Sequence, residues 1–477
     1  MIIPALVAFL ERDYFVARTF LYSSCAGVIV YTLISIALSN IVKAQNNFEK
    51  LLSFILSYLI LPIFMALPLV LSKTDVSLIN AWLEMVSSFT TTGLSINNLD
   101  TSSGSAIQLW LGMVSWIGGI FFWICAICIL LPLNISRFEI GANDLVQSSS
   151  IKRYKNNNSV LSSARHLIPI YLIITSALWF FLTLVGMSGF EALLMAMSVI
   201  STSGFDTLSD ETPKIFIIEG IILVFFVFAL SKSLFFRDIN DLRKFRFFTD
   251  PEIRLALIII LAVAGLFSAK SIFALSSENI DINILVLLKH LWGIFFTVTS
   301  YLVTMGIESK VWSDYPSFAL AEVSAVSVMG LAIIGGGVAT TAGGVKLLRV
   351  YILYRNAAQE VDMMLHPNSI PSKKGKGSIS DNRNNRLMAW IFFMLFITAL
   401  AFFTLVFSLL FDDIAPGLAL SVSALTTTGP LFGNAGYDVV LTDINQIFKI
   451  ILGLAMIIGR LEILVIVALL FPSVWSR

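Results

Sequence analysis

Charged residues are scarce in this chain. Only 13% of its 477 residues are Asp, Glu, Lys or Arg, against roughly 25% in soluble domains, whereas 57% are hydrophobic. The formal net charge is +1, and the sequence contains no dense basic tract and no basic face. This composition excludes an ordinary soluble domain and gives no support to nucleic-acid binding.

Cysteine and histidine are also rare, with three of each. Cys25 lies in an apolar run, and Cys125 and Cys128 form a C-x-x-C inside FFWICAICILL, where small packing residues are a better interpretation than a redox or metal pair. We therefore expect no disulfide framework and no tightly bound cofactor. None of the histidines lies near an obvious nucleophile in the sequence, so we do not expect an enzyme. The histidines are His166, His290 and His366.

Long apolar blocks make up most of the chain. A helix needs about 20 apolar residues to cross the bilayer core, and such blocks lie near residues 17–40, 51–72, 106–133, 167–187, 214–231, 253–275, 317–334, 388–411 and 446–471. The opening MIIPALVAFL is too short and runs into Glu11, Arg12 and Asp13, so no cleavable signal peptide is expected. These blocks predict an all-α polytopic membrane protein.

Four half-apolar stretches are too short to span the bilayer and predict re-entrant segments: 78–92, 189–203, 288–305 and 415–428. Non-helical backbone at membrane depth is tolerated only inside protein or beside a water-filled cavity. Basic residues crowd the connections near 43–50, 137–165, 237–254 and 355–386, which the positive-inside rule places in the cytoplasm. The re-entrant segments then open to the outer side, and four of them indicate a pore or a substrate pathway.

One pattern, S-x-x-x-T-x-G, recurs in the four re-entrant segments. It comprises Ser87, Thr91 and Gly93; Ser198, Thr202 and Gly204; Ser300, Thr304 and Gly306; and Ser423, Thr427 and Gly429. The residues before the glycines complete the candidate cation ligands: Thr92, Ser203, Met305 and Thr428. A single copy would mean little, because Ser, Thr and Gly also cap short helices. Four equivalently placed copies favour a functional repeat.

The residue types suit a dehydrated monovalent cation. Channel filters surround such an ion with rings of backbone carbonyls, and glycine allows the backbone to turn these carbonyls inward. The short helices would also direct their partly negative C-terminal ends at the ion. Asp206 and Glu308, each two residues past a filter glycine, would raise the local cation concentration at the mouth.

A second glycine-rich region, IIGGGVATTAGGVK, interrupts the apolar block after the third re-entrant segment. We interpret it as a broken helix with an irregular insert, because glycines destabilise helix by up to about 1 kcal/mol each. Close helix packing through small residues is the alternative. Arg460 in the last block could contact carbonyls of this insert and form a gate, or could pair with Glu462. The candidate gating residues are Gly335, Gly336, Gly337, Gly343, Gly344, Lys346 and Arg460.

Several motifs together resemble a known family. FTTTG, ISTSGF, GGGVATTAGGVK, YILYRNAAQEV and the closing GRLEILVIVALLFPSVW are similar to the Trk/Ktr/HKT superfamily of potassium transporters, and most similar to its bacterial TrkH type. This resemblance implies four M1–P–M2 repeats around one pore, with Gly93, Gly204, Gly306 and Gly429 in the filter. It also implies a gating loop at 335–344, a pore arginine at Arg460 and a location in the bacterial inner (plasma) membrane.

The resemblance implies an organisation and partners for the whole chain. The expected parts are an N-terminal helix pair with a short first helix (1–46), pore repeats at 47–135, 136–235, 236–355 and 387–477, and a cytoplasmic linker at 356–386. A homodimer is expected, with a ring of separate cytoplasmic, TrkA-like regulatory subunits that bind the nucleotide. Glycine rather than serine at Gly93 goes with potassium in this superfamily. Two residues depart from its usual motifs: Ala339 in the gating loop and Met305 in the third filter.

Two other functions remain as alternatives. A secondary transporter, such as a K⁺/H⁺ or K⁺/Na⁺ symporter or a sodium-permeable variant, would have broken helices at its centre, although such folds usually show two related halves rather than four units. An intramembrane enzyme would use Ser203 as a nucleophile, but the repeat already accounts for the Ser203–Gly204 pair.

Overall fold

The computed structural model describes residues 1–39, 47–72, 76–96, 104–126, 160–208, 214–231, 250–277, 284–311, 325–338, 340–366, 383–411, 413–437 and 441–461. Within these ranges every regular element is a helix, so the predicted all-α class is confirmed. The gating-loop residue Ala339, Cys128 and Glu462 lie outside the described residues.

In the part of the chain that the structure describes, six helices are long and apolar enough to cross a membrane. They are α2 (Tyr14–Leu38), α3 (Asn47–Ser72), α6 (Ser105–Cys125), α9 (Val160–Val185), α12 (Pro251–Ser277) and α16 (Arg383–Ser408). Most of them bury little of their surface, and only α6 is mostly enclosed by other helices. Their exposed leucines, isoleucines and phenylalanines suit contact with lipid tails, as expected of a polytopic membrane protein.

Three apolar helices are shorter than a full span: α11 (Ile215–Leu230), α14 (Ala325–Ile334) and α19 (Gln446–Leu461). Each follows one of the predicted re-entrant segments, as α6 follows the first. The sequence predicted longer blocks at 317–334 and 446–471, but residues 312–324 and 462–477 lie outside the described part of the chain.

Four short helices, of 12 to 19 residues, end inside the protein: α4 (Leu78–Phe89), α10 (Gly189–Ser201), α13 (Ile284–Leu302) and α17 (Ile414–Thr426). Each packs against the long helix that precedes it in the chain. Ser77 and Ser188 cap α4 and α10 by accepting a backbone N–H with the side-chain oxygen. Their last turns are buried, so these helices are held by protein rather than by lipid.

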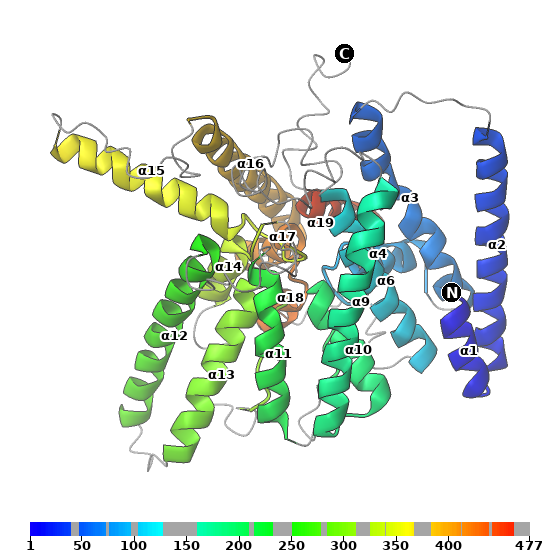
Figure 1. The fold of residues 1–477 in the computed structure, drawn as a ribbon, viewed down its shortest axis with the longest axis horizontal. Helices are drawn as coiled ribbons and strands as arrows, with labels where there is room; N and C mark the ends of the chain where they lie inside the picture. Colours follow the sequence, from blue (N-terminus) through cyan, green and yellow to red (C-terminus); the bar gives the residue numbers. More distant parts are fainter. Residues whose placement is uncertain are drawn as a thin grey trace.

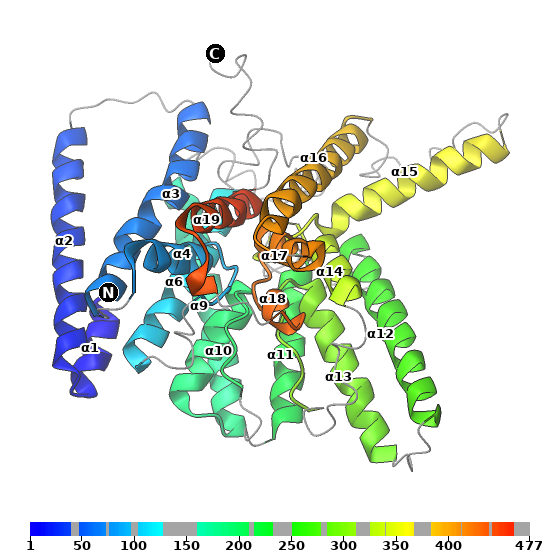
Figure 2. The ribbon, with the colours of Figure 1, turned by 180° about the vertical axis from the view of Figure 1, so that it is seen from behind.

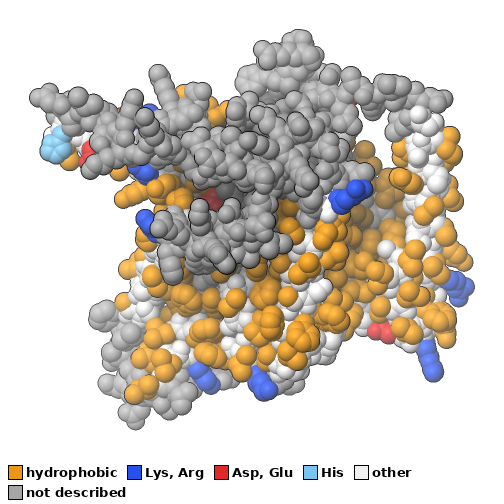
Figure 3. Space-filling model, in the orientation of Figure 1, with side chains coloured by type: hydrophobic (Ala, Val, Ile, Leu, Met, Phe, Trp, Pro, Cys, Tyr) orange, Lys and Arg blue, Asp and Glu red, His pale blue; other side chains and the backbone are white. Residues whose placement is uncertain are grey.

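The remaining elements lie around these four helices. The N-terminal helix α1 (Ile2–Leu10) packs against α2 at one end of the molecule, and α15 (Leu347–Leu365) projects at the other (Figures 1 and 2). Two short elements, α18 (Pro430–Asn434) and η8 (Leu441–Asp443), connect α17 to α19. On the face drawn in Figure 3, apolar side chains cover much of the described surface, and the basic side chains are few and scattered.

Candidate functional site: four helix-end loops and a glycine-rich insert

The four short helices end with the same unusual backbone conformation. The threonine of each S-x-x-x-T-x-G pattern has a positive φ: 57° at Thr91, 54° at Thr202, 60° at Thr304 and 54° at Thr427. β-Branched residues rarely adopt this left-handed conformation, which costs on the order of 1–3 kcal/mol. Four such residues at equivalent positions indicate that the surrounding structure imposes the turn.

A repeated hydrogen bond closes each turn. The residue after the threonine donates its backbone N–H to the carbonyl of the serine that starts the pattern. The nitrogen–oxygen distances are 2.8 Å from Thr92 to Ser87, 3.0 Å from Ser203 to Ser198, 3.0 Å from Met305 to Ser300 and 3.0 Å from Thr428 to Ser423. The bond captures a helix-end carbonyl that would otherwise lack a partner, and it leads the chain away from the helix axis.

The glycines of the four patterns differ in their backbone conformation. Gly93, Gly204 and Gly306 have φ of 70°, 71° and 78°, a region that glycine adopts without steric cost. Gly429 instead has φ of −55° and leads directly into α18, whose first residue is Pro430. A positive φ therefore accounts for glycine at three of the four positions and not at Gly429.

Close approach explains all four glycines, including Gly429. A Cβ atom would overlap, or press within 2.9 Å of, an atom of the next loop in every case. The atoms are the Ser203 carbonyl oxygen for Gly93, the Met305 carbonyl oxygen for Gly204, the Thr428 Cγ2 for Gly306 and the Leu94 nitrogen for Gly429. Loop one thus contacts loop two, two contacts three, three contacts four and four returns to one, which makes a closed ring.

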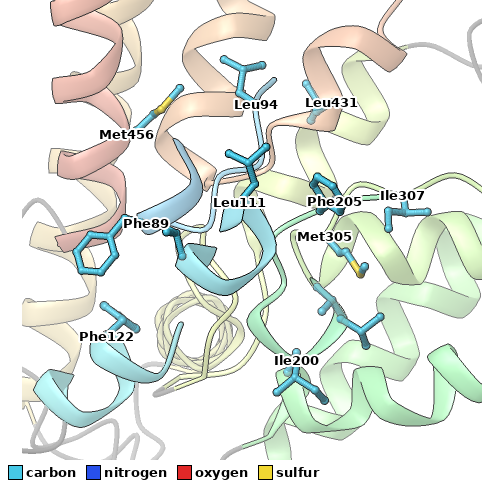
Figure 4. Packing of buried hydrophobic residues seen from close by; sticks show 14 of the residues in the cluster. Phe89, Leu94, Leu111, Phe122, Ile200, Phe205, Met305, Ile307, Leu431 and Met456 are labelled. Carbon is cyan, nitrogen blue, oxygen red and sulfur yellow. The ribbon is translucent and has the colours of Figure 1, made fainter. Parts of the chain in front are cut away.

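The ring also contains a hydrogen bond between loops. The Gly429 N–H donates to the Thr92 carbonyl over 2.6 Å and joins the fourth loop to the first. Apolar side chains pack tightly around the ring, including Leu94, Phe205 and Met305 (Figure 4). The twelve residues predicted as cation ligands therefore lie together at the centre of the molecule.

The glycine-rich region is an irregular insert between α14 and α15, as predicted. Gly335 and Gly344 have φ of 73° and 77°, and each lies against the other's backbone. Gly336 and Gly337 pack against the carbonyls of Ala229 and Leu230 at the end of α11, so a Cβ at either position would press on that backbone. The insert therefore has no regular secondary structure in its described residues. Its glycines allow it to pack closely against the end of α11.

The insert contacts the ring of loops directly. The Gly343 N–H donates to Thr304 Oγ1 over 2.7 Å, and Thr341 Oγ1 donates to the Ile200 carbonyl over 3.1 Å. A Cβ on Gly343 would overlap the Thr426 carbonyl oxygen. The insert thus contacts the second, third and fourth repeats at or next to the C-terminal ends of their short helices.

Two buried cations hold the insert. Arg460 is 2% exposed; its Nη1 donates to the Thr341 carbonyl over 2.5 Å, and its guanidinium lies 4.2 Å from the centre of the Phe122 ring. Lys346, with φ of 84°, donates its ammonium to the Ala342 carbonyl. The predicted contact between Arg460 and carbonyls of the insert is present. The alternative pair with Glu462 lies outside the described residues.

The mouth of the ring contains a basic residue that sequence analysis did not identify. Lys310 Nζ lies 3.5 Å from Asp206 Oδ2, so the charge of Asp206 is partly neutralised. Glu308 Oε1 accepts the Tyr301 hydroxyl over 3.2 Å. Burial raises the pKa of the Glu308 carboxyl, against the opposing effects of the Tyr301 hydroxyl and the Lys310 charge. Of the two predicted mouth acids, Glu308 is partly buried and Asp206 is paired.

A buried carboxylate braces the third loop from α11. Glu219 accepts the indole N–H of Trp292 over 2.9 Å, the Ser309 hydroxyl over 2.8 Å and the Lys310 backbone N–H over 2.9 Å. The sequence did contain a signal for this residue: Glu219 is an acidic residue within the apolar block 214–231. A charge inside a membrane protein is costly unless it has partners, so its partners could have been sought.

Comparison with known proteins agrees with this architecture. Residues 39–475 match the family described as TrkH, cation transport protein. The Trk system potassium uptake protein TrkH of Halomonas elongata is 28% identical over 426 residues, covering 88% of this chain and 84% of that protein. TrkH of Escherichia coli K12 is 26% identical over 496 residues, covering 100% of this chain and 96% of that protein.

A solved structure shares the fold. The crystal structure of the potassium transporter TrkH from Vibrio parahaemolyticus superimposes with a TM-score of 0.79, covers 99% of this chain and 95% of that chain, and is 22% identical in sequence. Because the family match extends over most of the sequence and the fold agrees over nearly all of it, this chain belongs to the TrkH family of cation transport proteins.

Proposed function

We propose that the chain is the potassium-conducting subunit of a Trk-type uptake system, and that potassium passes through the centre of the four-loop ring. The observation that supports this most directly is the closed order of loop contacts, in which four helix ends with the same turn meet one another. Backbone oxygens from four loops can then surround one axis, as a dehydrated monovalent cation requires. The relatives named above are potassium uptake proteins.

The inter-loop hydrogen bond sets a condition on conduction. The Thr92 carbonyl accepts the Gly429 N–H, so it offers an ion only its remaining lone pair. An ion entering the ring would draw this carbonyl toward the axis and lengthen the bond to Gly429. Ion binding and the spacing between the first and fourth loops are therefore coupled in this proposal.

The test is the ratio of rubidium to sodium flux into liposomes that hold the purified chain, with rubidium as a tracer for potassium. In Gly93→Ser the added side chain meets the Ser203 carbonyl and forces the first two loops apart. We expect rubidium flux in the parent and a lower ratio in the variant. Gly265→Ala, on α12 with nothing near the added methyl, is the matched control. An unchanged ratio in Gly93→Ser would refute the filter assignment.

We also propose that the insert is the gate. It contacts the ends of α10 and α17 and Thr304 of the third loop, and Arg460 binds it through the Thr341 carbonyl. A positive charge beside the pathway also repels cations. Opening then requires the insert to leave the ends of the helices, with Arg460 releasing Thr341.

The expected partners remain proposals. We propose a homodimer that binds a cytoplasmic ring of nucleotide-binding regulatory subunits. In support, α15 is a projecting helix on which Tyr354, Met364 and Leu365 are exposed. Size-exclusion chromatography with light scattering would show twice the 52.6 kDa of one chain for a homodimer. Copurification of the co-expressed regulatory subunit, lost when Met364 and Leu365 are changed to Ser, would support the docking site.

A further inference from the structure

The third loop lacks an internal brace that the other three loops have. In loops one, two and four, the residue before the glycine has a hydroxyl that bonds back to a hydroxyl in its own short helix or in the residue that directly follows the helix. The oxygen–oxygen distances are 2.8 Å between Thr92 and Thr90, 3.3 Å between Ser203 and Ser198 and 3.1 Å between Thr428 and Thr426. The third loop has Met305 at this position, and a thioether cannot replace the hydroxyl donor.

The first serine of the pattern also differs in the third loop. The serine that starts each pattern uses its hydroxyl on the loop: Ser87 with the Leu94 backbone, Ser198 with Ser203 and Ser423 with the Gly429 carbonyl. Ser300 is fully buried, and its Oγ has no hydrogen-bond partner among the described residues. A buried hydroxyl without a partner is unfavourable, so the third loop is held less firmly from within.

Another set of contacts holds the third loop from the fourth repeat. Asn434, the last residue of α18, donates its amide nitrogen to the Gly306 carbonyl over 3.1 Å and to the Tyr301 hydroxyl over 2.9 Å. Tyr301 in turn donates to Glu308 Oε1 over 3.2 Å. Tyr301 and Glu308 lie on either side of Met305 and Gly306 in the chain, so these bonds pin the loop before and after its filter glycine.

The chemistry of the partners determines the direction of each bond. A carbonyl oxygen can only accept, so the Asn434 atom that faces Gly306 must be the amide nitrogen. Its second hydrogen then goes to the Tyr301 oxygen, and the Tyr301 hydroxyl hydrogen is left for Glu308. In this series of hydrogen bonds, which runs from Glu308 through Tyr301 and Asn434 to Gly306, each donated hydrogen therefore has one acceptor.

We propose that Asn434 and Tyr301 are positioning residues that orient the Gly306 carbonyl and so set ion selectivity, in place of the hydroxyl brace that Met305 cannot supply. The proposal rests on the filter function proposed above. It assigns the two residues no contact with the ion. They act through the Gly306 carbonyl, whose direction decides how well the third loop matches the other three around a potassium ion.

The test compares the effect of Asn434→Ala in two backgrounds, using the rubidium-to-sodium flux ratio in liposomes. In the parent, losing the bond to Gly306 should lower the ratio by about fivefold, the equivalent of one ordinary hydrogen bond. In Met305→Ser, the new hydroxyl can reach Ser300 Oγ as Ser203 reaches Ser198. Asn434→Ala should then lower the ratio by less than about twofold, because the loop has its internal brace.

Tyr301→Phe provides a second variant, which keeps the aromatic side chain of residue 301 in place and removes only its hydroxyl. It should lower the ratio by less than Asn434→Ala does, because Asn434 can still donate to Gly306. Tyr437→Phe is the matched control: its ring packs against Phe432 near the same mouth, 6.1 Å between ring centres, and its hydroxyl has no role in the proposal. We expect no change in the ratio for this control.

Three outcomes separate the possibilities. If Gly93→Ser alters the ratio but Asn434→Ala and Tyr301→Phe do not, the filter assignment stands and the brace is refuted. An equal loss from Asn434→Ala in both backgrounds would also refute the brace, because it would show no exchange with the Met305 position. If Gly93→Ser leaves the ratio unchanged, the proposed filter itself fails.

Discussion

At the scale of single residues, the site depends on atoms that face one another at close range. Arg460 is an example: a guanidinium in an apolar helix is costly, and here its Nη1 binds the Thr341 carbonyl while its plane lies on Phe122. The sequence already showed a charge that needed a partner. It suggested carbonyls of the insert as one possible partner, but it could not show that the Thr341 carbonyl, 119 residues away, is the one that Arg460 binds.

Arg460→Ala tests this contact. Removing the guanidinium frees the Thr341 carbonyl and takes a positive charge from the pathway, so basal rubidium flux should rise by about tenfold, as for a lost charged hydrogen bond. Tracer uptake into liposomes without a regulatory subunit measures it. Arg386→Ala, which removes a guanidinium bound to Gln359 instead, should leave the flux unchanged. Parental flux in Arg460→Ala would remove Arg460 from the gate.

At the scale of elements, the existence of the helices follows from composition, and their ends follow from the ring. The blocks predicted at 51–72, 167–187 and 388–411 correspond to α3, α9 and α16 within a few residues. The four short helices lie where the sequence predicted re-entrant segments, because half-apolar stretches between spans have few other interpretations. The left-handed threonines at their ends were not predicted, since local preference opposes them.

The insert is the element whose packing can be tested with one methyl group. Gly343→Ala places a Cβ against the Thr426 carbonyl, so the insert must move away from the fourth loop. We expect a severalfold higher basal rubidium flux, measured as above. Gly330→Ala on the adjoining α14 is the matched control, because nothing lies near its added methyl and alanine favours helix by up to about 1 kcal/mol. Equal flux in the two variants would contradict the gating role.

At the scale of the whole molecule, one ring receives contributions from four parts of the chain that are far apart in sequence. The cross-loop contacts join residues as distant as Thr92 and Gly429. A pathway through one central ring needs no alternation between two halves, which distinguishes it from a symporter with a binding site between two repeats.

A potential-driven flux assay tests this distinction. With sodium absent and equal pH on both sides, rubidium uptake into liposomes should continue and should increase with an inside-negative potential, because an open ring conducts without a coupled ion. The potential supplies about 2.3 kcal/mol per charge per 100 mV. Uptake that stops without a proton or sodium gradient would favour the coupled transporter instead. Empty liposomes at the same potential are the control.

The sequence by itself determined the apolar blocks, the four re-entrant segments and the repeated pattern, because membrane burial and helix-ending residues act over short stretches of chain. Only the tertiary structure decided which loop meets which, that Lys310 neutralises Asp206, and that Asn434 reaches the Gly306 carbonyl. These contacts depend on how separate helices pack. They form because four helix ends crowd together at one place. Each backbone oxygen there must either accept a hydrogen bond or point into the ring of loops.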